Sequence, residues 1–129
     1  MTQDYTNIIN ERAQHVFDVM AKRVPAEDIK RLREAFELAK EAHAPQKRKT
    51  GEPYILHPIA VATIAAEELM LGTNPVMAAF LHDVVEDTPY TIDDIRQRFG
   101  DDVAFLVKVV TKTKKEKYDD SKQVDNYRQ

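Results

Sequence analysis

The 129-residue chain has no cysteine, and this absence limits its chemistry first. It excludes a disulfide framework, a thiolate zinc site and a thiol nucleophile, so nitrogen and oxygen atoms must hold any bound metal. Runs of about 18 apolar residues, the length of a membrane span, are also missing. Residues 1–11 are too polar for a signal peptide. The sequence therefore predicts a cytoplasmic protein with no membrane contact.

Glycine and excess positive charge are scarce as well. The net charge is −3 and the chain has only three glycines, none in a Walker-type phosphate loop. The negative balance argues against a general affinity for nucleic acid, although basic residues cluster at 47–49 and 112–117. Hydrophobic residues make up 43% of the chain and charged residues 32%, which is typical of one globular domain.

Apolar residues recur at helical spacing through most of the chain, which predicts an all-α fold over residues 1–129. The pattern predicts an N-terminal helix within residues 1–24 and further helices over 29–43, 57–69, 73–87 and 91–99. Residues 103–110 are rich in β-branched side chains, as in a strand, but their 3.6-residue period favours a helix. Residues 112–120 are strongly polar and predict an exposed loop before a new helical start at Ser121.

Several helix boundaries are marked by their residue types. Pro58 suits the first helical position, where an amide hydrogen would have no partner. Gly72 suits a C-terminal stop, and the next helix restarts at Thr73-Asn74-Pro75, where a capping side chain is followed by proline. Thr91 and Asp94 resemble a capping box. These signals predict short loops between the helices.

The strongest chemical signal lies at His82 and Asp83, which follow each other in an apolar stretch. Glu86 and Asp87 lie one helical turn further on, so one face gathers a histidine and three carboxylates. Burying such charges together is unfavourable unless a cation neutralises them or one group stays protonated. The alternative interpretation is a solvated face at a helix C-terminus, although acidic residues there oppose the helix dipole. The pattern favours a metal site.

The remaining histidines carry less information individually. His57 precedes a proline and by itself could simply cap a turn, so its value depends on the other site residues. His43 falls on the buried stripe of its helix and is predicted to be a hydrogen-bonded core or pocket-lining residue. His15 is predicted to lie at the surface.

A basic stretch at Arg48, Lys49 and Thr50 precedes Gly51 in the longest irregular segment between predicted helices. Such a run is usually a solvated loop. Arginine, however, binds phosphate in a bidentate manner, and a hydroxyl beside a glycine amide adds further donors. The stretch therefore remains a candidate phosphate-binding loop.

Two stretches together resemble the hydrolase domain of the RelA/SpoT homologue family, which belongs to the HD phosphohydrolase superfamily. They are RKTGEPYILHP at residues 48–58 and FLHDVVEDT at residues 80–88. The resemblance extends from about Ala35 to the C-terminus and includes residues 99–100 and 110–112. It implies an all-α HD-domain helical bundle that removes the 3′-pyrophosphate of (p)ppGpp to give GDP or GTP in the stringent response.

The resemblance also assigns roles to individual residues of this chain. The metal, usually Mn²⁺ in the family, would be bound by His57, His82 and Asp83. Glu86 and Asp87 would help to activate the attacking water. The guanosine tetra- or pentaphosphate would contact Arg48, Lys49 and Thr50, with Thr50 in place of the family's more common serine.

One feature of the family is not reached by this sequence. The family's fourth metal ligand is an aspartate on a later helix, so we expect an incomplete domain that lacks its C-terminal helices and is weakly active or inactive alone. A (p)ppGpp synthetase domain often follows in the family. Two alternatives remain open: an HD phosphohydrolase that acts on another nucleotide, and a non-catalytic, nucleotide-binding regulatory module.

Overall fold

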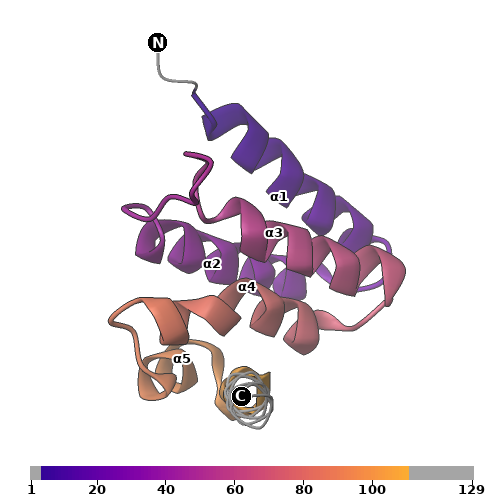
Figure 1. Ribbon diagram of the computed structural model, residues 1–129. Coiled ribbons are helices and arrows are strands. Elements are labelled where there is room, and N and C mark those ends of the chain that lie inside the picture. The colour runs from indigo at the N-terminus through magenta and orange to yellow at the C-terminus, as the bar shows by residue number, and fades with distance from the viewer. Residues whose placement is uncertain (1–3, 111–129) are drawn as a thin grey trace, which may run out of the picture.

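A computed structural model describes residues 4–110, which form a bundle of short helices (Figure 1). The elements in chain order are α1 (Thr6–Ala21), α2 (Ala26–Ala42), α3 (Leu56–Thr63), the π-helical turn η1 (Ile64–Glu68), α4 (Thr73–Asp87) and α5 (Ile92–Phe99). Residues 101–110 are also helical, which confirms helix over strand there. The only β-pairing within the described range is an isolated bridge between Lys47 and Pro53. The predicted all-α fold is therefore confirmed.

Helix α4 lies at the centre of the bundle, packed against α2 and α3, and α1 covers the other side of these two helices (Figure 1). Three buried aromatic rings join α1, α2 and α4. The ring centroid of Phe80 lies 6.2 Å from that of Phe17 and 5.9 Å from that of Phe36. Because each ring removes a large apolar area from water, this cluster fixes the position of the helix that carries His82 and Asp83.

The connection from α3 to α4 differs from the prediction. Gly72 does not end the third helix; it has a φ of −78° and is the N-cap of α4. The chain instead passes through η1 and turns at Met70, which has a φ of 53°. The guanidinium of Arg23 donates hydrogen bonds to the carbonyl oxygens of Ala66 at 2.8 Å and Leu71 at 3.2 Å. A tertiary contact thus satisfies carbonyl groups at this helix end.

The other boundary predictions have mixed outcomes. The predicted capping side chain at the start of α4 is absent, because the N-cap is Gly72. The hydroxyl of Thr73 instead donates to Oδ2 of Asp28 at 2.9 Å and so links α4 to α2. The capping box of Thr91 and Asp94 is confirmed, with both reciprocal hydrogen bonds present. Pro58 lies two residues after the start of α3, still within the turn whose amides lack helical partners.

None of the described helices is long and apolar enough to span a membrane. The predicted loop at 112–120 and the helical start at Ser121 lie outside the described residues.

Candidate metal centre

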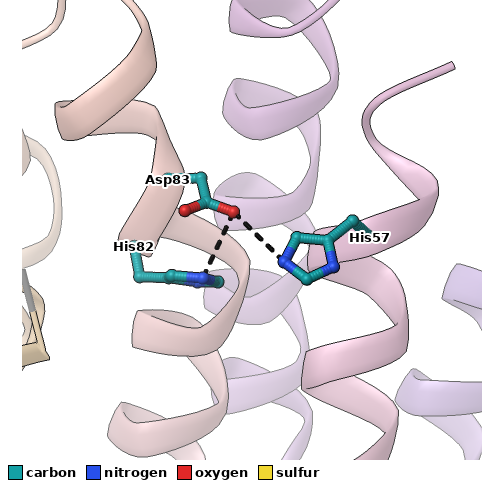
Figure 2. A group of neighbouring side chains, drawn as sticks. All are labelled: His57, His82 and Asp83. Carbon is teal, nitrogen blue, oxygen red and sulfur yellow. Dashed lines mark ion pairs between the residues drawn. The ribbon is translucent and has the colours of Figure 1, made fainter. Parts of the chain in front are cut away.

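His57, His82 and Asp83 meet at the contact between α3 and α4 (Figure 2). His57 lies in the first turn of α3, whereas the other two residues follow each other on α4. The side chain of Asp83 is 0% exposed, that of His82 is 11% exposed and that of His57 is 39% exposed. The group is therefore anchored in the core and opens to solvent on the His57 side.

The distances within this group suit a single ion. Oδ2 of Asp83 lies 3.5 Å from Nε2 of His57 and 3.2 Å from Nε2 of His82. One ligand atom from each residue lies within 4.8 Å of the others. Ligand atoms about 2.1 Å from an ion lie about 3.0–3.5 Å from each other in tetrahedral or octahedral geometry. Small side-chain movements would thus bring all three residues onto one cation.

The hydrogen bonding of His82 also favours a cation. Its Nδ1 lies 2.8 Å from the carbonyl oxygen of Ala79, which can only accept, so Nδ1 carries a hydrogen. In the neutral ring, Nε2 then directs a lone pair toward the carboxylate oxygen of Asp83. Two acceptors at this distance repel each other unless a proton or a metal ion lies between them. The backbone contact fixes the imidazole orientation in the manner typical of metal-binding histidines.

Tyr54, two residues before the start of α3, is a component of the site that the sequence did not predict. Its hydroxyl, whose one hydrogen the two carboxylates share, lies 3.0 Å from Oδ2 of Asp83 and 3.2 Å from Oδ2 of Asp87. Burial and the two neighbouring carboxylates raise the pKa of Tyr54 above its usual value, so the phenol remains a neutral donor. Its position three residues before His57 was the only sequence signal. A single tyrosine in an irregular segment forms no periodic pattern that would indicate its role.

The two predicted catalytic carboxylates lie in the last turn of α4 and are exposed. The shared tyrosine contact places Asp87 on the same face as Asp83, as the helical spacing predicts. The backbone carbonyl of Asp87 also accepts a hydrogen bond of 2.6 Å from Nε2 of Gln46. Glu86 is adjacent to Asp87 at the open end of the helix. Both residues remain candidates for proton transfer.

The basic stretch forms a closed turn, which we call the basic turn (residues 47–53). The amide of Arg48 donates to the carbonyl of Glu52 at 2.8 Å, and that of Gly51 donates to the carbonyl of Arg48 at 2.8 Å. Gly51 has a φ of 89°, a left-handed conformation that favours glycine. Arg48, Lys49 and Thr50 are exposed on this turn. The structure therefore places the predicted phosphate-binding residues on a hydrogen-bonded, solvent-facing loop.

The other two histidines lie where the sequence predicts. His43 is 1% exposed, and its Nδ1 lies 2.9 Å from Oε1 of Gln46. Nε2 of His43 has no hydrogen-bond partner among residues 4–110. His15 is exposed and lies 2.9 Å from Glu67 on η1. Neither residue belongs to the group of His57, His82 and Asp83 that could hold a metal ion.

Comparison with known proteins identifies the class of this helical bundle. Residues 35–129 match the family described as HD domain, and the chain belongs to that family. It is 51% identical over 107 residues to the bifunctional (p)ppGpp synthase/hydrolase SpoT of Escherichia coli, covering 81% of this chain and 15% of that protein. It is 45% identical over 128 residues to the guanosine-3′,5′-bis(diphosphate) 3′-pyrophosphohydrolase of Aquifex aeolicus, covering 99% of this chain and 16% of that protein.

A solved structure supports the same assignment. This chain is 39% identical to a metazoan ortholog of SpoT described as hydrolyzing ppGpp, with a TM-score of 0.61. The similarity covers 63% of this chain and 47% of that chain. The predicted HD-domain fold is thus confirmed, and the present chain spans about one sixth of the length of the bacterial relatives it matches.

Proposed function

We propose that this chain is the hydrolase domain of a (p)ppGpp 3′-pyrophosphohydrolase that uses Mn²⁺ and acts in the cytoplasm in the bacterial stringent response. The observation that carries the proposal is the fully buried carboxylate of Asp83 between the imidazoles of His57 and His82. The names of the bacterial relatives, and the activity described for the metazoan ortholog, supply the substrate.

The three residues fit a hard or borderline divalent cation. Two imidazole nitrogens and one carboxylate suit Mn²⁺, and the sequence has no cysteine that would favour a softer metal. When bound, such an ion supplies Lewis acidity and lowers the pKa of a coordinated water molecule toward neutral pH. His57, His82 and Asp83 would hold it on the side of the group that His57 leaves open to solvent. The carboxylate of Asp83 supplies the negative charge of this ligand set.

The proposed reaction cleaves one phosphorus–oxygen bond. The water oxygen forms a bond to the phosphorus that carries the ribose 3′ oxygen, and the bond between that phosphorus and the 3′ oxygen breaks. The 3′ oxygen leaves with the nucleotide and takes up a proton to become a hydroxyl, while the water oxygen becomes part of the pyrophosphate. A carboxylate oxygen of Asp87 or Glu86 accepts the proton that the water loses. Arg48 and Lys49 offset the phosphate charge from the basic turn, and Thr50 adds a hydroxyl donor.

The test uses His82→Ala in the complete protein that carries this sequence, with His15→Ala as the matched control. Mn²⁺ binding is measured by isothermal titration calorimetry and pyrophosphate release from ppGpp by a coupled assay. Replacing a residue that only hydrogen-bonds a metal ligand lowers metal affinity or activity by about 10- to 100-fold. Loss of a ligand itself should therefore weaken Mn²⁺ binding by more than about 100-fold and abolish turnover. His15→Ala should behave as wild type. Equal Mn²⁺ binding by wild type and His82→Ala would refute the site.

Substrate choice needs its own comparison, because the metal ligands do not select a base. The wild-type protein is assayed with ppGpp, dGTP and a cyclic dinucleotide at equal concentrations. The proposal expects the highest kcat/KM for ppGpp. A higher value for either competitor would favour an HD phosphohydrolase with another substrate.

Synthesis of (p)ppGpp is a second candidate activity of the complete protein. It is favoured by the name of the Escherichia coli relative, which is a bifunctional synthase and hydrolase. Asp83→Asn separates the two activities: hydrolysis should be lost, while pyrophosphate transfer from ATP to GTP should continue if it uses another site. Loss of both activities would contradict two separate sites.

A further inference from the structure

The ring of Tyr54 is held between two imidazoles. Its centroid lies 4.8 Å from that of His43, which is buried, and 5.9 Å from that of His57. His43 is in turn fixed by its contact with Gln46. The phenol therefore has a defined direction that does not depend on its own hydrogen bonds, and its hydroxyl is presented to α4.

That hydroxyl contacts the same oxygen that faces both imidazoles, Oδ2 of Asp83. A carboxylate oxygen has two lone pairs, so it can accept one hydrogen bond and still bind a cation with the other. Hydrogen bonds to a ligating carboxylate are a common means of fixing its orientation. The phenol is well placed to hold Asp83 in the orientation that the two histidines require.

Tyr54 also connects the group of His57, His82 and Asp83 to the basic turn. The two residues that flank the turn are paired through the amide of Tyr54 and the carbonyl of Gln46, 3.1 Å apart. Both also contact Asp87, Tyr54 through the carboxylate and Gln46 through the backbone carbonyl. The residues on either side of the basic turn are therefore both hydrogen-bonded to the end of α4.

We propose that Tyr54 is a positioning residue of this site: its hydroxyl holds the carboxylates of Asp83 and Asp87 in register and fixes the basic turn beside them. This inference rests on the proposed function and adds a residue to it. Because the ring is already packed by His43 and His57, Tyr54→Phe removes the positioning contact and leaves the packing in place.

The experiment compares wild type, Tyr54→Phe and the control Tyr90→Phe in the complete protein. Tyr90 precedes α5 and is half-buried, with the guanidinium of Arg98 over its ring. It is not part of the group of His57, His82 and Asp83. Calorimetric titration with Mn²⁺ should show binding weakened by about 10- to 100-fold in Tyr54→Phe and unchanged in Tyr90→Phe. Circular dichroism in a chelator checks that each variant is folded.

A second measurement uses wild type alone, so it remains valid if Tyr54→Phe does not fold. Mn²⁺ at Asp83 changes the charge beside the phenol and should produce a tyrosine difference absorbance that saturates with metal binding. Binding of Mn²⁺ to wild type without this signal would overturn the inference.

The outcomes separate this inference from the proposed function. If wild type neither binds Mn²⁺ nor releases pyrophosphate, the proposed function fails and the inference fails with it. If wild type does both, and folded Tyr54→Phe binds Mn²⁺ as tightly as wild type, only the role of Tyr54 is refuted.

Discussion

Asp83→Asn is the most direct test of the electrostatics of the site. The substitution keeps the shape of the side chain and an oxygen that can accept from Tyr54, but it removes the negative charge of the three residues that we propose as metal ligands. Oδ2 of Asp83 lies within 3.5 Å of both imidazole nitrogens. Neither histidine can supply the negative charge that the substitution removes. We expect Mn²⁺ affinity to fall by at least about 100-fold, which corresponds to about 2.7 kcal/mol.

The assay is calorimetric titration of Mn²⁺ in the complete protein, with Asp93→Asn as the matched control. Asp93 lies in the first turn of α5, has a side chain that is 78% exposed and pairs with Arg96 at the surface. Its replacement should leave Mn²⁺ binding unchanged, since exposed ion pairs contribute little. Mn²⁺ binding to folded Asp83→Asn within a factor of about three of wild type would refute the reasoning, because that difference is less than about 0.7 kcal/mol.

Three further predictions concern stability and ionisation. Phe80→Ala removes the ring that joins α1, α2 and α4 and should cost about 3–5 kcal/mol in urea unfolding; a cost below about 1 kcal/mol would contradict this account of the core. Thr91→Ala should cost about 1 kcal/mol by the same measurement, whereas Thr91→Ser should retain most of that stability because the hydroxyl still caps α5. In metal-free protein, the raised pKa of Tyr54 should keep it from ionising with ordinary tyrosines near pH 10. Its stabilising contribution should be fully present below about pH 10 and decline at higher pH. Up to about pH 11, the absorbance change from tyrosine ionisation should therefore be equal in folded wild type and folded Tyr54→Phe, because Tyr54 does not contribute to it. In denaturant the change should be larger for wild type, which has one more ionising tyrosine. If Tyr54→Phe lowers the absorbance change by the same amount in folded and denatured protein, the raised pKa of Tyr54 is contradicted.

Much of the site was predictable from short stretches of sequence. His82 and Asp83 are adjacent, so their proximity needs only a helix, and their apolar neighbours predict burial. The spacing of Asp83 and Asp87 likewise places both on one helical face, as their shared contact with Tyr54 confirms. Convergence of His57 on this pair was predicted by family resemblance, because no local pattern relates residues on different helices.

The sequence by itself determined the helices, since the 3.6-residue apolar period and the capping box at Thr91 act within single turns. Tertiary structure decided the features that depend on partners distant in the chain. Met70 takes a left-handed turn where Gly72 was expected to end the helix, because packing and Arg23 fix that end. Tyr54 reaches two carboxylates because α3 and α4 pack together, and packing distances are not written in any local spacing.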